Sequence, residues 1–158
     1  LSAYTGVKRR QEVRAEVGGV KVIDDFAHHP TAVRETIDAV AGRNPGRRIV
    51  AVFEPRSNTS RRSLHHAEYA KSFGGAALAV LAAPQKHDKV PEDDRLDVEK
   101  LCADISANGT PARAFVETDG ILAFVLAETR PGDVILVMSN GSFGCLIGRL
   151  IEGLPQSR

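Results

Sequence analysis

The chain has 158 residues, 42% of them hydrophobic, which is enough to bury one ordinary core without disulfides or a structural metal. Its 21 Lys and Arg residues balance 20 Asp and Glu residues, so a formal net charge of +1 gives no global field to attract nucleic acid or an anionic membrane. No apolar run approaches the roughly 20 residues that span a bilayer. Cys102 and Cys145 lie inside apolar helical patterns and are expected to be reduced core thiols, which favours a cytoplasmic protein.

The chain is predicted to begin with a β-hairpin followed by a helix. Residues 11–17 and 20–25 alternate or run apolar around a Gly-Gly pair, which is a two-residue turn signal. Pro30 lacks an N–H group and therefore suits the first turn of a helix, which we expect to run to about Ala41.

Strands and helices then alternate along the chain. The segments expected after the first helix are a strand over 48–53, a helix over 61–73, a strand over 76–83, a helix over 96–107, a strand over 112–116, a helix over 119–129, a strand over 133–138 and a last helix with an apolar stripe at Phe143, Leu146, Ile147, Leu150 and Ile151. Such alternation requires parallel pairing. We therefore predict a three-layer α/β fold: a mostly parallel, Rossmann-like sheet of about six strands, opened by an antiparallel hairpin and covered by helices on both faces.

Side-chain spacing also predicts local details. Thr118 is expected to cap the helix that follows it, and Ser142 can cap the last helix after a left-handed turn at Gly141. In the helix over 61–73, an apolar row of Leu64, Ala67 and Ala70 should share one side. In the helix over 96–107, the residues expected to face inward are Val98, Leu101, Cys102 and Ile105.

Four polar clusters each follow directly after a predicted strand. They occupy residues 24–29, 54–62, 85–88 and 139–142. In a parallel sheet the carboxyl ends of the strands lie at one edge, so these clusters should gather there and form a binding site. The start of the helix at Pro30 adds free amides and the positive end of a dipole, which suits an anion or a sugar-phosphate.

The same cluster raises the question of a metal site. Asp24, Asp25, His28 and His29 offer carboxylate and imidazole ligands at a spacing that could converge. No second cluster of matching ligands is evident, and adjacent histidines at 65 and 66 would face apart by about 100° on a helix. We therefore expect no dedicated metal site.

Four stretches are similar to one known family. Residues 24–30 (Asp-Asp-Phe-Ala-His-His-Pro) resemble the aspartate-aromatic-small-His-His-Pro signature of the C-terminal domain of Mur ligases, and 6–12, 53–59 and 137–144 support the match. Together they resemble the murein peptide ligase branch. The resemblance implies an ATP- and Mg²⁺-dependent enzyme that joins the murein tripeptide L-alanyl-γ-D-glutamyl-meso-diaminopimelate to UDP-N-acetylmuramate in peptidoglycan recycling.

The resemblance also implies roles for residues in the first clusters. Arg10 would lie near the bound nucleotide, and the Asp25 carboxylate would accept hydrogen bonds from the ribose hydroxyls. Phe26 and His28 would line the gap between nucleotide and peptide. This makes Phe26 a cofactor-binding candidate and His28 both a substrate-binding and the catalytic candidate.

The other implied contacts belong to the peptide. Arg56, Asn58 and Arg61 are candidates because arginine pairs bidentately with carboxylates, in which the implied peptide is rich. Ser139 and Asn140 are implied contacts for the diaminopimelate end.

The resemblance implies a part of a larger enzyme. There is no G-x-x-x-x-G-K-[ST] phosphate loop in the sequence, and in Mur ligases that loop and the magnesium ligands belong to a central domain, with the UDP-sugar site in an N-terminal domain. We therefore expect residues 1–158 to be a single C-terminal domain excised from a larger ligase, inactive alone, holding no cofactor tightly, and positioning the peptide amine and part of ATP.

Three alternatives stay open. The first is the C-terminal domain of a UDP-N-acetylmuramate–L-alanine ligase, although that enzyme tends to have Gln-Pro-His-Arg-Tyr where this chain has Glu-Pro-Arg-Ser-Asn at 54–58. The second is a non-catalytic α/β module that binds a nucleotide or peptide. The third is a metal-dependent phosphoesterase that uses Asp24, Asp25, His28 and His29.

Overall fold

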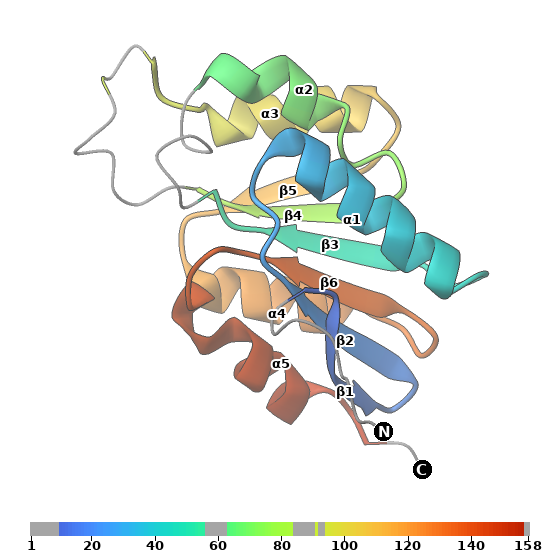
Figure 1. The fold of residues 1–158 in the computed structure, drawn as a ribbon. Helices are drawn as coiled ribbons and strands as arrows, with labels where there is room; N and C mark the ends of the chain where they lie inside the picture. The colour runs from blue at the N-terminus through green and yellow to red at the C-terminus, as the bar shows by residue number, and fades with distance from the viewer. Residues whose placement is uncertain (1–9, 56–62, 84–90, 92–93, 157–158) are drawn as a thin grey trace.

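The computed structural model describes residues 10–55, 63–83, 91 and 94–156, which form one six-stranded sheet between two layers of helices (Figure 1). The strand order is β1-β2-β6-β3-β4-β5; β1 and β2 pair antiparallel, and the other neighbours pair parallel. The strands are β1 (Glu12–Val17), β2 (Val20–Asp25), β3 (Ile49–Phe53), β4 (Leu78–Ala82), β5 (Ala112–Phe115) and β6 (Val134–Met138). The predicted fold class is confirmed.

Helices cover both faces of the sheet (Figure 1). On one face lie α1 (Pro30–Arg43), α2 (His66–Ala70) and α3 (Val98–Ala107), and on the other lie α4 (Thr118–Glu128) and α5 (Leu146–Gly153). Two short 3₁₀ turns, η1 (Ser63–His65) and η3 (Phe143–Cys145), precede α2 and α5. None of the described helices has the length and apolar character needed to cross a bilayer.

Strand β3 illustrates how the sequence builds two cores. Its side chains alternate, so Ile49, Ala51 and Phe53 pack beneath α1 and α2, whereas Val50 and Val52 pack beneath α4 and α5. All five are buried. A strand buried on both faces must be apolar at every position, which is why the predicted strand appeared as a continuous run.

The hairpin between β1 and β2 closes as predicted, and its turn requires glycine. Gly18 and Gly19 have φ angles of +58° and +82°, which L-residues rarely adopt. A Cβ atom on Gly18 would lie 2.1 Å from the carbonyl oxygen of Pro155, so the turn also makes room for the backbone at Pro155.

An ion pair fixes the amino ends of β3 and β6. Arg48 donates to both carboxylate oxygens of Asp133, with Nε–Oδ1 and Nη2–Oδ2 distances of 3.0 and 2.8 Å. Burial by itself would raise the pKa of Asp133, but the hydrogen bonds from Arg48 and from the Arg130 N–H hold that pKa below its ordinary value. The ion pair therefore stabilises the folded state at neutral pH.

The segment before α2 differs from the prediction. Only η1 and the five-residue α2 form within the described part of 61–73, and Leu64, expected in one apolar row with Ala67 and Ala70, is 75% exposed. Ala67 is exposed too, whereas Tyr69, Ala70 and Phe73 are buried. The change from 3₁₀ to α geometry breaks the 3.6-residue phase on which the predicted row depended.

The linker between β6 and α5 also differs from the prediction. Its left-handed residues are Phe143, Gly144 and Cys145, with φ angles of 49°, 58° and 58°; Gly141 is not left-handed, and Ser142 makes no side-chain cap. Thr118 faces this turn, since its Oγ1 would lie 3.1 Å from a Cβ atom on Gly144.

Thr118 is the first residue of α4 and does not cap it. The N-cap is Glu117, which makes no side-chain cap bond. By contrast, α3 has a side-chain cap, because Asp97 accepts a hydrogen bond from the Lys100 N–H. The residues expected to face inward, Val98, Leu101, Cys102 and Ile105, are buried.

Neither cysteine forms a disulfide, as expected. Cys102 lies buried in α3, as expected of a core thiol, whereas Cys145 is exposed, so the expected core position is wrong for Cys145. Burial, with a smaller contribution from the Glu99 carboxylate, raises the pKa of the Cys102 thiol to about 12. Cys102 is therefore a core residue without thiolate character at neutral pH.

Candidate functional site

The loops that follow β2, β3 and β6 meet at the carboxyl edge of the sheet. The Ser139 N–H donates to the Asp25 carbonyl at 3.1 Å, and the Glu54 N–H donates to the Met138 carbonyl at 3.0 Å. The predicted convergence is confirmed for these three loops. Residues 56–62 and 85–88, which include the candidates Arg56, Asn58 and Arg61, lie outside the described part of the chain.

The strand order creates a switch point at this edge. After β2 and β3 the chain leads to α1 and α2 on one face, whereas after β6, which lies between them, it leads to α5 on the other. Neighbouring loops that run to opposite faces diverge, and open α/β sheets bind ligands at such points. The topology therefore selects this edge as the candidate site.

Asp25 holds three segments together at the site. Its Oδ1 accepts from the Ala27 N–H at 2.8 Å and the Thr36 hydroxyl at 3.4 Å, and its Oδ2 accepts from the Gln11 N–H at 2.8 Å. The residue is only 5% exposed. Its carboxylate thus has a structural role that sequence reasoning missed, and the predicted ribose contact stays a prediction.

Arg10 is brought to the same edge. Gln11 precedes β1, whose Glu12 pairs with Asp24 near the carboxyl end of β2. The hydrogen bond from the Gln11 N–H to Asp25 therefore places the exposed Arg10 one residue from that carboxylate. Arg10 and Asp25, two of the three residues predicted to meet the nucleotide, therefore lie near each other.

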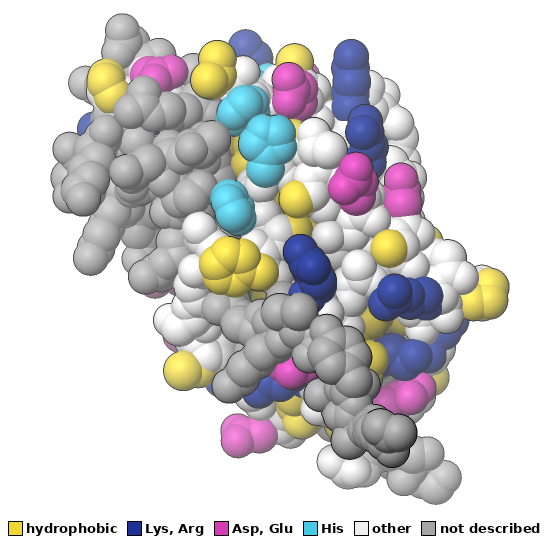
Figure 2. All heavy atoms as spheres, in the orientation of Figure 1, with side chains coloured by type: hydrophobic (Ala, Val, Ile, Leu, Met, Phe, Trp, Pro, Cys, Tyr) yellow, Lys and Arg dark blue, Asp and Glu magenta, His cyan; other side chains and the backbone are white. Residues whose placement is uncertain are grey.

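Phe26 and His28 form an aromatic pair on the surface of this edge. Their ring centroids are 5.9 Å apart at 89°, and Phe26 is 49% exposed. The Tyr69 hydroxyl donates to the His28 carbonyl, which ties the loop to α2. Figure 2 shows histidine side chains gathered beside a large apolar side chain on this face of the molecule. An exposed ring beside an imidazole suits stacking and hydrogen bonding to a ligand.

Ser139 and Asn140 differ in how their side chains are used. The Ser139 hydroxyl is buried; it donates to Glu54 Oε1 at 2.6 Å and accepts from the Gly141 N–H at 3.0 Å. The Asn140 Oδ1 atom is buried and accepts no hydrogen bond from any residue that the structure describes. Buried acceptors are normally paired, so Asn140 is the better candidate for a ligand contact.

The histidines separate into two groups. His29 accepts a hydrogen bond from the Thr31 N–H at 3.2 Å and caps α1, and its ring lies 4.9 Å from that of His65. His66 instead contacts Asp104 Oδ2 at 2.7 Å, so the two adjacent histidines do face apart. Among the described residues the group that could hold a metal ion is His29, His65 and Glu68. This set shares only His29 with the four ligands that the phosphoesterase alternative requires.

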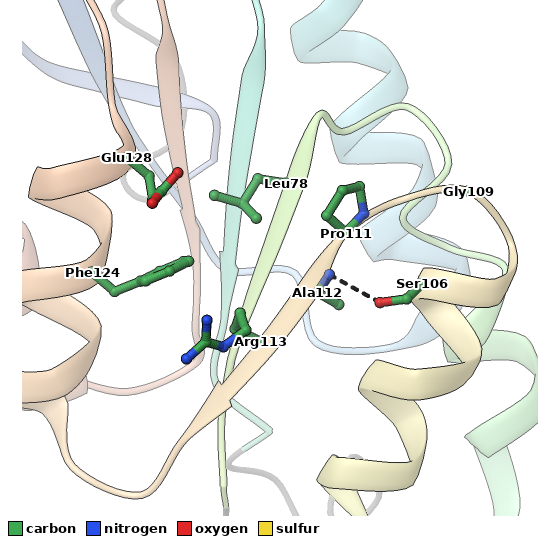
Figure 3. Close-up of a pocket in the computed structure, with 8 residues that line it drawn as sticks. All are labelled: Leu78, Ser106, Gly109, Pro111, Ala112, Arg113, Phe124 and Glu128. Carbon is green, nitrogen blue, oxygen red and sulfur yellow. Dashed lines mark hydrogen bonds between the residues drawn. The ribbon is translucent and has the colours of Figure 1, made fainter.

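A shallow pocket lies at the opposite edge of the sheet (Figure 3). It is bordered by Leu78 and Ala112, the first residues of β4 and β5, and by Phe124 and Glu128 of α4. The guanidinium of Arg113 lies 5.1 Å from the centre of the Phe124 ring. Because this pocket is at the amino ends of the strands, it is separate from the converging loops.

Sequence reasoning missed several residues that shape the site. The Glu54 side chain joins two loops through Ser139, the Tyr69 side chain joins α2 to the loop after β2, and Thr36 reaches Asp25 from α1. Each of these partners is separated from its contact by eleven residues or more, and no local pattern encodes such pairings. Only the position of Glu54, directly after a strand, is a usable signal.

Comparisons with known proteins agree with this geometry. The family model described as "Mur ligase, glutamate ligase domain" matches residues 9–141. The chain is 39% identical over 157 residues to the UDP-N-acetylmuramate–L-alanyl-γ-D-glutamyl-meso-2,6-diaminoheptandioate ligase of Escherichia coli, covering 99% of this chain and 32% of that protein. It is 38% identical over 162 residues to the UDP-N-acetylmuramate–L-alanine ligase of Symbiobacterium thermophilum, covering 100% of this chain and 32% of the relative.

A solved structure is also similar to this chain. The crystal structure of a murein peptide ligase from Psychrobacter arcticus superposes with a TM-score of 0.80 at 29% identity, covering 96% of this chain and 31% of that one. The chain thus spans about a third of the length of the curated relatives it matches. Since the family model covers most of its length and the fold agrees, this chain belongs to the Mur ligase family.

Proposed function

We propose that this chain is the C-terminal domain of an ATP- and Mg²⁺-dependent ligase that joins L-alanyl-γ-D-glutamyl-meso-diaminopimelate to UDP-N-acetylmuramate in peptidoglycan recycling. The observation that carries the proposal is the 39% identity over 157 residues to the Escherichia coli ligase named for that peptide. The need for ATP and a nucleotide sugar gives the enzyme a cytoplasmic location.

The reaction needs two steps. The carboxylate of the muramate attacks the γ-phosphorus of ATP, which gives an acyl-phosphate and releases ADP. The L-alanyl amine of the peptide then attacks the acyl carbon, the amide bond forms, and inorganic phosphate and a proton leave. This domain positions the amine against the acyl-phosphate and excludes water, since the acyl-phosphate would otherwise hydrolyse. Other domains of the ligase hold the phosphates, the metal and the UDP-sugar.

The carboxyl edge supplies candidate groups for both ligands. Arg10, Asp25 and Phe26 form the adenosine side, where the exposed Phe26 ring offers a stacking surface. His28, next to Phe26, faces the gap in which the amine and the acyl-phosphate meet. In this proposal the His28 imidazole receives the proton that the amine loses, which makes it the candidate catalytic residue.

The peptide side lies over the loop after β6. Ser139 orders this loop through Glu54, and Asn140 contributes a buried carbonyl oxygen with no donor among the described residues. The side-chain ammonium of diaminopimelate is the hydrogen-bond donor proposed to pair with this oxygen. Arg56, Asn58 and Arg61 are proposed to pair with the peptide carboxylates, on the basis of residue type and family position.

The direct test is amide formation by the ligase that contains this chain. With ATP, Mg²⁺ and UDP-N-acetylmuramate, we expect tripeptide-dependent release of phosphate and a UDP-muramyl-tripeptide product detectable by mass spectrometry. Product formed from L-alanine and not from the tripeptide would reject this substrate assignment.

A second candidate is the alanine-adding reaction on the same UDP-sugar. The observation in its favour is the 38% identity to the alanine ligase of Symbiobacterium thermophilum, nearly equal to that of the peptide ligase relative. The same assay separates the two, because each candidate predicts product from only one of the two amines.

A further inference from the structure

We propose that His29, His65 and Glu68 form a binding site for a divalent transition metal of the zinc class. One ligand atom from each residue lies within 4.8 Å of the others, and His65 Nδ1 is 3.7 Å from Glu68 Oε2. The three side chains come from the loop before α1, from η1 and from α2. A metal ion there would join two segments that are distant in sequence.

The donor set fits this class of metal. Two imidazole nitrogens and one carboxylate oxygen are a recurrent three-ligand set for zinc, with a fourth position left for water. Metal–ligand distances of about 2.0–2.2 Å at tetrahedral angles place ligand atoms about 3.3 Å apart, so each pair must close by at most about 1.5 Å. The Glu68 side chain is 63% exposed and can move by this amount.

The two histidines are already positioned. The His65 side chain is only 18% exposed and its ring lies edge-on to Tyr69, 6.4 Å between centroids. The His29 ring is fixed at the start of α1 by its hydrogen bond to the Thr31 N–H. The two rings meet edge-to-face, with 4.9 Å between centroids and 65° between planes. Ligands that are held in place before binding lose little freedom when the metal arrives.

Helix capping explains only part of this arrangement. The cap of α1 uses Nδ1 of His29 and gives no reason for His65 and Glu68 to lie beside it. Metal binding must also change the cap. A metal at Nδ1 takes the lone pair that accepts from Thr31, and a metal at Nε2 moves the ring proton to Nδ1, which can then no longer accept. The amide of Thr31 is therefore a reporter of the site.

The neighbouring His66 provides a matched control. It is adjacent to His65 in sequence and is also paired with a carboxylate, that of Asp104 at 2.7 Å. It belongs to no group of three ligands among the described residues. A weak, nonspecific affinity of surface histidines would use both positions, whereas the proposed site uses only His65.

The first experiment is titration of the 158-residue chain with Co²⁺, followed by displacement with Zn²⁺. We expect one equivalent of Co²⁺ to produce visible absorption bands of a tetrahedral complex, which Zn²⁺ abolishes. His65→Ala and Glu68→Gln should weaken binding by roughly 10–100-fold, whereas His66→Ala should leave it within about twofold. The His65 side chain makes no capping hydrogen bond to α2, so His65→Ala removes no cap from that helix. Circular dichroism checks the fold of each variant.

The second experiment follows the backbone amides by NMR during Zn²⁺ addition. The Thr31 resonance should shift in the wild type and in His66→Ala, and stay fixed in His65→Ala. Absence of cobalt bands at millimolar metal, or equal binding by folded His65→Ala and wild type, would overturn the proposal. Neither experiment involves the peptide, ATP or the UDP-sugar, so the outcome is independent of the proposed ligase function.

Discussion

Asp25 is predicted to contribute stability as well as ligand binding. Its carboxylate accepts from the backbone of Gln11 and Ala27 and from the Thr36 hydroxyl. In Asp25→Asn one carboxylate oxygen becomes an NH₂ group, which leaves a buried donor facing another donor. We expect a loss of about 1–3 kcal/mol in the free energy of unfolding, measured with urea. Asp38→Asn, an exposed change on α1, should cost less than about 0.5 kcal/mol; equal costs would contradict this role for Asp25.

Asn140 is predicted to act on peptide affinity and not on stability. Because its Oδ1 atom has no partner among the described residues, Asn140→Ala removes no hydrogen bond from the described fold. In the ligase that contains this chain, we expect tripeptide affinity to fall by about tenfold, equivalent to about 1.4 kcal/mol, with an unchanged melting temperature. The matched control is Ser142→Ala, whose exposed side chain makes no cap bond. Equal tripeptide affinity in Asn140→Ala and Ser142→Ala would rule out the contact.

For single residues, the sequence predicted where the side chains lie better than what each side chain does. The residues Asp25, Phe26, His28 and Ser139 were expected at the site because each ends or follows a strand, and the structure brings them to one edge. The buried hydrogen bonds of Asp25 and Ser139 could not be predicted, since their partners lie on other elements. Residue type does not distinguish a carboxylate that binds a ligand from one that holds a loop.

Among the elements, the η3 turn is strained at Cys145, and glycine at that position would relieve the strain. Cys145 has a φ of 58°, a region that costs a side-chain-bearing residue about 1–2 kcal/mol, and its side chain is exposed. Glycine adds about 0.4–1 kcal/mol of entropy to the unfolded chain. We therefore expect Cys145→Gly to raise the free energy of unfolding by about 0.5–1 kcal/mol, and Cys145→Ala to leave it nearly unchanged, both by urea titration. Destabilisation by glycine would mean that the turn is not strained.

The ion pair between Arg48 and Asp133, at the amino ends of β3 and β6, predicts that the free energy of unfolding falls in acid. The pKa of Asp133 lies below its ordinary value of 3.8 in the folded state. Its contribution is therefore complete above pH 3.8, the pKa expected when unfolded, and is lost as pH falls through the lower folded value. Asp133→Asn should cost about 1–3 kcal/mol at pH 7, and the difference from wild type should shrink below pH 3.8.

The control for that measurement is an exposed pair. Asp119 pairs with Arg149 on the surface, where solvent screens the charges, so Asp119→Asn should change stability by less than about 0.5 kcal/mol at every pH. A difference between Asp133→Asn and wild type that stays constant from neutral to acid pH would contradict the assigned ion pair.

The elements that the sequence predicted well are those fixed by one local rule. The spacing of Val98, Leu101 and Ile105 identified α3 because the helix keeps a single phase throughout. The helix predicted around Leu64 was wrong because a 3₁₀ turn precedes only five α-helical residues there. The left-handed turn at η3 was missed because Phe143, a bulky residue, is rarely found there and is held by its burial beneath α4 and α5.

At the scale of the whole molecule, the strand order determines which loops can share a ligand. With β6 between β2 and β3, the loops after these three strands are neighbours, and β4 lies one strand farther away. The alternation of strands and helices predicted a parallel sheet and a shared carboxyl edge, but not this order. Sequence-local signals carry no information on which strands pair, since pairing depends on packing across the whole sheet.

The central claim is that the carboxyl edge of this chain recognises the diaminopimelate end of a murein tripeptide. The most direct measurement is calorimetric titration of the proposed ligase that contains this chain, saturated with a non-hydrolysable ATP analogue and UDP-N-acetylmuramate. We expect saturable 1:1 binding of the tripeptide, and binding at least about tenfold weaker for the same peptide without diaminopimelate. Equal affinity for the two peptides, or binding of L-alanine in place of either, would contradict the claim.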